Sequence, residues 1–186
     1  MDRLGSVGVV TYRLGPEDGT LSVRTQRTGA AAMAGHNLLI HVTAWEATIE
    51  LGEDASVALE ADGSSLRVRE GGGGMQALQD EDMENIRQTI DDEVLMGERI
   101  RFRSTEVRPA AGAAGLHVEG ELTLLGETRP FGFDLALTGD GRLAGNAVVK
   151  QSDWGMKPYS GLFGALKVVD EVDVRIEATL PEPQSR

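Results

Sequence analysis

The sequence contains no cysteine, which excludes disulfide bonds, thiolate nucleophiles and cysteine-ligated metal sites. Aromatic residues make up only 4% of its 186 residues, so a core must be built mainly from aliphatic side chains. Positive charge is also scarce, because 18 Lys and Arg face 30 Asp and Glu, for a net charge of -12. Such a surface repels phosphate backbones and anionic headgroups, so we expect no nucleic-acid partner. No apolar run is long enough for stable membrane insertion.

The length fits one domain, which we place at residues 1–180, followed by a polar C-terminal tail at 181–186. The first residues, MDRLGSVGVVTYRLG, contain Gly, Ser, Thr and Arg where a secretory signal would need an unbroken apolar stretch. We therefore expect a cytoplasmic protein.

Apolar residues alternate with polar ones along most of the chain, which is typical of half-buried β-strands. One long strand that bends partway is predicted between Leu39 and Leu51. A turn at Asp62-Gly63 predicts a hairpin between the strands on either side of it. Arg99, Arg101 and Arg103 share one face of a further strand and are expected outside. Later alternating segments begin near residues 116, 131, 143 and 172.

The one predicted helix runs from about residue 80 to 95, after a run of glycines at 71–74. Met83, Ile86, Ile90 and Val94 form its apolar stripe, and three carboxylates occupy the first turn, where the helix dipole favours them. We expect this helix to lie across one end or side of the sheet. About eight strands without a βαβ rhythm predict an all-β antiparallel barrel or sandwich, and the pattern alone does not separate the two.

Several strings resemble the YceI-like family. The segment VEGELTLLGETRPFGFDL at 118–135 is similar to the family's strand ending in Gly-x-Leu-Thr-x-x-Gly and the Thr-Arg-Pro strand after it. The segment SDWGMKPYSGLFGALKVVDEVDVRIEATL at 152–180 resembles its closing loop and last strand. The string Phe-Arg-Ser-Thr at 102–105 and the Gly-His pair at 35–36 also match. The resemblance implies a lipocalin-like, extended antiparallel β-barrel that carries polyisoprenoids or other long amphiphilic molecules in an interior tunnel.

An eight-stranded barrel is just wide enough to be filled by side chains or to hold one small ligand. We predict that it holds an elongated apolar or amphiphilic ligand, whose burial would gain about 25 cal/mol per Å². The residues expected inside are Trp45, Ile49, Phe102, Leu122, Phe131, Phe133, Trp154 and Phe163. The loop with Met156 and Tyr159 either covers a portal or closes the barrel, and the sequence favours neither. His36, at a strand entry, is expected to hydrogen-bond the backbone or to cap the barrel mouth, with ligand contact as the weaker interpretation.

Catalytic and metal sites are not expected. His36 and His41 would lie ~16 Å apart in extended chain and on opposite faces, and His117 sits on the polar face of its strand. The glycine run lacks a following Lys-Ser or Lys-Thr, and no Gly-x-Ser-x-Gly elbow is present. We therefore predict no cofactor, no metal and no enzymatic activity.

Two other functions stay open at this point. The barrel could be filled and act through its surface as a stress-related or structural interaction module. An enzyme would need polar groups that converge in the pocket. Monomer and homodimer are both compatible with the sequence, as are a neutral and a phosphorylated isoprenoid or lipid-like partner.

Overall fold

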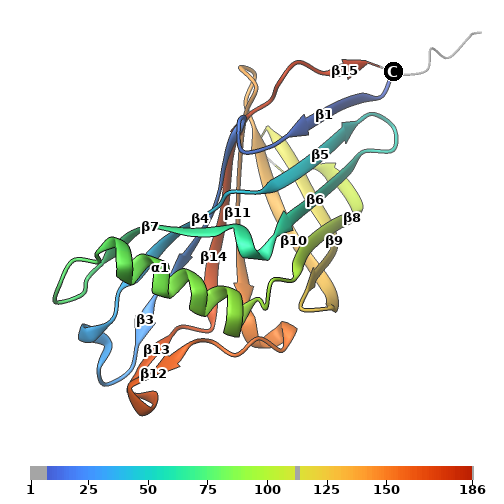
Figure 1. Cartoon of the computed structure of the whole chain (residues 1–186). Helices are drawn as coiled ribbons and strands as arrows, with labels where there is room; N and C mark the ends of the chain where they lie inside the picture. The colour runs from blue at the N-terminus through green and yellow to red at the C-terminus, as the bar shows by residue number, and fades with distance from the viewer. Residues whose placement is uncertain (1–7, 112–113, 186) are drawn as a thin grey trace, which may run out of the picture.

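The computed structural model describes residues 8–111 and 114–185. Residues 1–7 and 186, at the outer ends of the predicted domain and tail, lie outside the described residues. Within the described part, antiparallel strands dominate and form one large curled sheet (Figure 1). This confirms the predicted all-β, lipocalin-like class.

The large sheet contains twelve strands in the described residues, rather than about eight. Their order across the sheet is β15 (Gln184–Ser185), β1 (Val10–Leu14), β5 (Trp45–Leu51), β6 (Ser56–Asp62), β8 (Arg99–Pro109), β9 (Gly115–Leu124), β10 (Glu127–Leu137), β11 (Arg142–Lys150), β14 (Glu171–Thr179), β2 (Gly19–Thr25), β4 (Asn37–Val42) and β7 (Leu66–Gly72). A small second sheet joins β12 (Ser160–Gly161), β13 (Leu166–Val168) and β3 (Arg27–Thr28). The short strand β15 lies in the predicted polar tail and pairs with β1.

The predicted strand from Leu39 to Leu51 is two strands, β4 and β5, separated at Thr43 and Ala44. Ile40 and Val42 are buried before the break, whereas Trp45, Ala47 and Ile49 are buried after it. The break therefore shifts the inward face by one residue. β4 pairs with β2 and β7, while β5 pairs with β1 and β6.

The predicted hairpin at Asp62-Gly63 is wrong for a related reason. A 3₁₀ turn at Gly63–Ser65 bends the chain without reversing it, so β7 pairs with β4 and not with β6. The two bends lie side by side, because the Thr43 amide donates to Ser65 O (3.1 Å) and the Asp62 amide donates to Ala44 O (3.0 Å). The strands β4-β5 and β6-β7 thus form one kinked ribbon. Its β4 and β7 make up one end of the sheet order, and its β5 and β6 lie two strands in from the other end.

The helical segment connects β7 to β8. These two strands are not paired with each other in the described part of the chain. It consists of α1 (Asp80–Thr89) and a π-helical turn at Ile90–Val94, close to the predicted 80–95. A capping box at Gln79 and Asp82 starts α1, with the Asp82 carboxylate accepting the Gln79 amide at 2.9 Å. Figure 1 shows α1 lying across the side of the curled sheet, as expected for an element that covers its open edge.

Candidate functional site

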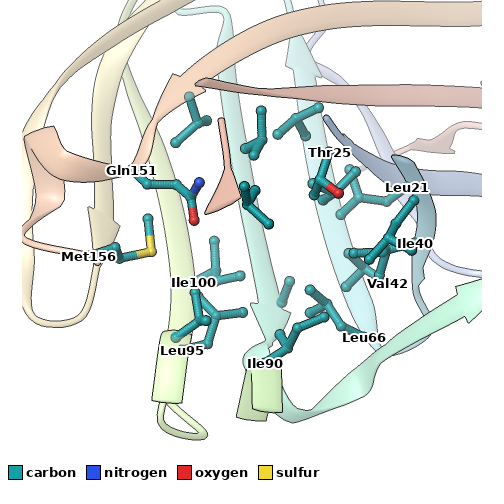
Figure 2. A pocket seen from close by; sticks show the side chains of 18 of the residues that line it. Leu21, Thr25, Ile40, Val42, Leu66, Ile90, Leu95, Ile100, Gln151 and Met156 are labelled. Carbon is teal, nitrogen blue, oxygen red and sulfur yellow. The ribbon is translucent and has the colours of Figure 1, made fainter. Parts of the chain in front are cut away.

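The curled sheet and α1 enclose a cavity of about 850 Å³. Its wall is largely aliphatic, because the inward positions of most strands carry Leu, Ile, Val or Ala. Figure 2 shows such side chains from several strands surrounding an open space. Wall residues such as Val23, Leu38, Leu59 and Val174 are only half-buried, although they point inward. Their remaining exposure is to the cavity, so side chains do not fill the interior.

Three phenylalanines form one part of this wall. The ring centroids of Phe102 and Phe133 lie 5.0 Å apart, and Phe131 lies 6.5 Å from Phe102 and 6.2 Å from Phe133. Phe102 comes from β8 and the other two from β10, where their alternate positions place both side chains on the inner face. The predicted residues Ile49 and Leu122 also line the cavity.

The two tryptophans are buried but do not line the cavity, contrary to the prediction. Trp154 packs behind the phenylalanines, with its ring 6.0 Å from that of Phe131 and its Nε1 donating to Leu122 O at 2.9 Å. Trp45 lies in the core with an Nε1 that has no hydrogen-bond partner among the described residues. Trp45 is the first residue of β5, and Trp154 ends the 3₁₀ turn at Gln151–Trp154 that follows β11.

Phe163 was predicted inside, and this is wrong. Its side chain is fully exposed, in the turn between β12 and β13. It lies in the glycine-rich connection after β11, where no strand periodicity directs a side chain inward, and Leu162 and Phe163 have positive φ angles of 49° and 54°. Met156 and Tyr159, from the loop predicted as either a portal or a closure, both line the cavity. Met156 is buried, and Tyr159 is 39% exposed.

Polar side chains line one end of the cavity. We call this end, formed by five residues, the polar end: Thr25, Arg27, His36, Gln76 and Lys167. Along β2 and β3 the inward side chains change from Leu21 and Val23 to Thr25 and then Arg27. The Thr25 hydroxyl is buried without a hydrogen-bond partner in the described part of the chain (Figure 2). A buried hydroxyl without a partner costs free energy, so it is an unused donor and acceptor for a ligand.

Contacts with the backbone hold two of these side chains in place. Arg27 donates from its guanidinium to Gly35 O at 2.6 Å. His36 Nε2 lies 2.6 Å from Gln76 O, so this nitrogen is the donor and the ring is fixed beside the mouth. A backbone hydrogen bond was one of the two roles predicted for His36. Thr25, Arg27 and Lys167 were not predicted, although the change from apolar to polar side chains along 21–27 is visible in the sequence.

The cavity opens at the polar end. Several of its wall residues there are also exposed to solvent, namely Ala34, Met75, Gln76, Ala77, Tyr159 and Lys167. Deeper inside, Gln151 is a buried polar group, and its amide donates to Val169 O and Asp170 O at 3.1 and 3.2 Å (Figure 2). The cavity is therefore amphiphilic, with a long apolar interior and a polar entrance.

Two groups that are not part of the cavity wall have displaced pKa values. Hydrogen bonds from Ser152 lower the pKa of Asp170, and burial together with the nearby Arg69 lowers that of His41. No group of three His, Asp or Glu side chains within the described ranges is arranged to hold a metal ion. Nor is any helix in that part of the chain long and apolar enough to cross a bilayer.

The model of the YceI-like domain matches residues 12–180. The chain belongs to the YceI-like family. Among solved structures, Burkholderia cenocepacia BcnA is similar with a TM-score of 0.63 and 14% identity, over 86% of this chain and 94% of that one. A polyisoprenoid binding domain from Saccharophagus degradans, implicated in plant cell wall breakdown, has a TM-score of 0.51 and 11% identity, over 92% and 98%. At these identities the similarity establishes the fold alone. Comparison with curated proteins gives no match.

Proposed function

We propose that this YceI-like protein binds and carries an elongated isoprenoid or lipid-like molecule inside its cavity. The observation that carries the proposal is the aliphatic and aromatic wall around about 850 Å³ of unfilled space. Ligand pockets commonly have volumes of about 300–1,000 Å³ and mostly apolar walls. Each Å² of hydrocarbon moved from water to this wall gains about 25 cal/mol, so a linear chain would bind without a deep polar anchor.

The polar end gives the ligand a direction. A polar headgroup would lie beside Arg27 and His36, where it would also meet the unpartnered Thr25 hydroxyl, and the hydrocarbon chain would extend toward Phe102 and Phe133. The reverse orientation would bury the headgroup among apolar side chains at a large desolvation cost. A polyisoprenoid-binding structure among the similar folds supports this class of ligand.

A carrier without catalytic activity fits the wall better than an enzyme. The ionisable side chains in the wall, Arg27, His36, Asp82, Tyr159 and Lys167, gather at the entrance rather than around a buried reacting centre. No nucleic-acid partner is proposed, given the net charge of -12. The cytoplasmic location and the choice between monomer and homodimer stay predictions. The unfilled interior argues against a module that acts through its surface alone.

Filling the cavity from one strand tests the proposal. Ala147 points inward from β11, so Ala147→Phe would occupy space that the hydrocarbon chain needs. Uptake of a polyprenol probe, measured by native mass spectrometry of protein incubated with it, is expected to fall about tenfold or more, a loss of ~1.4 kcal/mol of binding free energy. The control is Ala144→Phe, on the exposed face of the same strand, which should take up the probe like the unmodified protein. Wild-type protein that takes up no probe, or equal uptake by both variants, would contradict the proposal.

A further inference from the structure

Large apolar side chains are exposed on three loops at the end of the molecule where the cavity opens. Met33 is 60% exposed, Met75 73%, Leu162 56% and Phe163 fully exposed. Figure 1 shows these loops at one end: the blue loop before β4, the green loop after β7 and the orange turn after β12. We call these four side chains the apolar rim.

Backbone hydrogen bonds hold the loops of the apolar rim together. The Met75 amide donates to Met33 O at 3.2 Å, which joins the first two loops. The Ala31 amide donates to Ala165 O at 2.8 Å, which joins the first loop to the turn that carries Phe163. The three loops that carry the apolar rim are therefore joined to one another beside the entrance.

The turn that presents Leu162 and Phe163 has an unusual conformation for these residues. Both adopt positive φ, which is uncommon for large apolar side chains and is favoured by Asn and Gly. The turn lifts Phe163 away from the protein, so neither side chain contributes to the core. Backbone strain and solvent exposure at the same two residues indicate a role other than stability.

We infer that the apolar rim docks the entrance of the cavity onto the surface of a lipid bilayer. The occupant follows from the cavity, because a ligand with a long hydrocarbon chain is dissolved in a membrane and not in water before it is bound. A rim inserted among the headgroups would let that chain pass between membrane and cavity without crossing water. In this respect the inference rests on the proposed carrier function.

Charge decides which bilayer the rim should bind. Arg27 and Lys167 line the entrance. The first turn of α1, whose Asp82 also lines the cavity, carries Asp80, Glu81 and Asp82, and the whole chain has a net charge of -12. Attraction to anionic lipid therefore contributes little, and insertion of apolar side chains must provide the affinity. Vesicles of phosphatidylcholine alone should be sufficient.

Flotation with phosphatidylcholine vesicles tests docking directly. The double variant Leu162→Asn, Phe163→Gly places in the turn the residue pair that positive φ angles favour, so it should fold at least as stably as the original chain. We expect its vesicle-bound fraction to fall about tenfold, since two exposed apolar side chains are lost. Val148→Asn is the matched control, because Val148 is 50% exposed on the outer face of β11, and its binding should not change.

A second variant reports the contact itself. Phe163→Trp keeps an aromatic side chain at the rim, and brominated phosphatidylcholine should quench its fluorescence beyond the level shown by the buried Trp45 and Trp154. Absence of flotation by the unmodified protein, or equal flotation by the double variant, would overturn docking. Polyprenol uptake from detergent solution is measured in parallel. Uptake without vesicle binding would reject docking alone, and vesicle binding without uptake would reject the carrier function alone.

Discussion

His117 lies on the outer face of β9 between two carboxylates. Its Nδ1 is 2.6 Å from an Asp134 oxygen on β10, and its Nε2 is 2.9 Å from a Glu119 oxygen on its own strand. Both contacts are hydrogen bonds only when both ring nitrogens carry protons. The hydrogen bonds to Asp134 and then Glu119 therefore raise the pKa of His117 above 6.5, against a smaller opposing effect of burial and Arg108.

This pKa predicts a pH dependence of stability. Because the pKa is raised in the folded state, the contribution of His117 is fully present below pH 6.5 and is lost as the pH rises through the folded-state value. Asp134→Asn should lower the pKa of His117, measured by NMR titration. It should also weaken the fall in the free energy of unfolding, measured with urea, as the pH rises above 6.5. His41 is the internal control, since its pKa is lowered by burial and Arg69 and should not respond. An unchanged His117 titration in Asp134→Asn would show that the carboxylate does not hold the proton.

Single residues show how far the sequence could predict the site. Ile49, Phe102, Leu122, Phe131 and Phe133 lie in regular strands, where two-residue periodicity determines the face, and they do line the cavity. Trp45 and Trp154 do not line it. Trp154 lies in a 3₁₀ turn, outside the strand periodicity, whereas Trp45 keeps the inward phase of β5 but is its first residue and is buried in the core. Phe163 was misplaced because it lies in a connecting turn, where no strand pattern determines the direction of its side chain. Its turn has positive φ angles that the local sequence does not favour.

At the scale of elements, strand content, the helix and the outward arginines of β8 were predictable. The kinks at residues 43–44 and 63–65 were not, because the hydrogen bonds that join them link segments about twenty residues apart. Gly63 illustrates this: its amide donates to Glu98 O at 3.1 Å, and an added Cβ would come within 2.3 Å of the same oxygen. Only the assembled structure shows that this glycine is needed for close approach rather than for a hairpin.

The helical segment is the element most sensitive to a ligand. Ile86, Ile90 and Val94 line the cavity, yet no residue of α1 is buried, so its packing depends on whatever fills the space beneath it. We predict that polyprenol slows amide hydrogen exchange in residues 80–94 more than in the paired strands β11 and β14. Mass spectrometry of exchanged peptides measures this, with Ala147→Phe as the control that should show no ligand effect. Slower exchange in the strands alone would indicate a binding site elsewhere.

At the scale of the whole molecule, an unfilled apolar cavity lowers the stability of the ligand-free protein, because its wall lacks contacts on one side. A ligand that binds only the folded state stabilises it by about 2.7 kcal/mol at one hundred times its dissociation constant. For a chain of this length, each kcal/mol raises Tm by roughly 2–4 °C, so a rise of roughly 5–10 °C is expected with polyprenol. Differential scanning calorimetry measures it. Ala147→Phe should show little or no rise and Ala144→Phe the full rise. A shift that survives in Ala147→Phe would place the stabilising ligand outside the curled sheet.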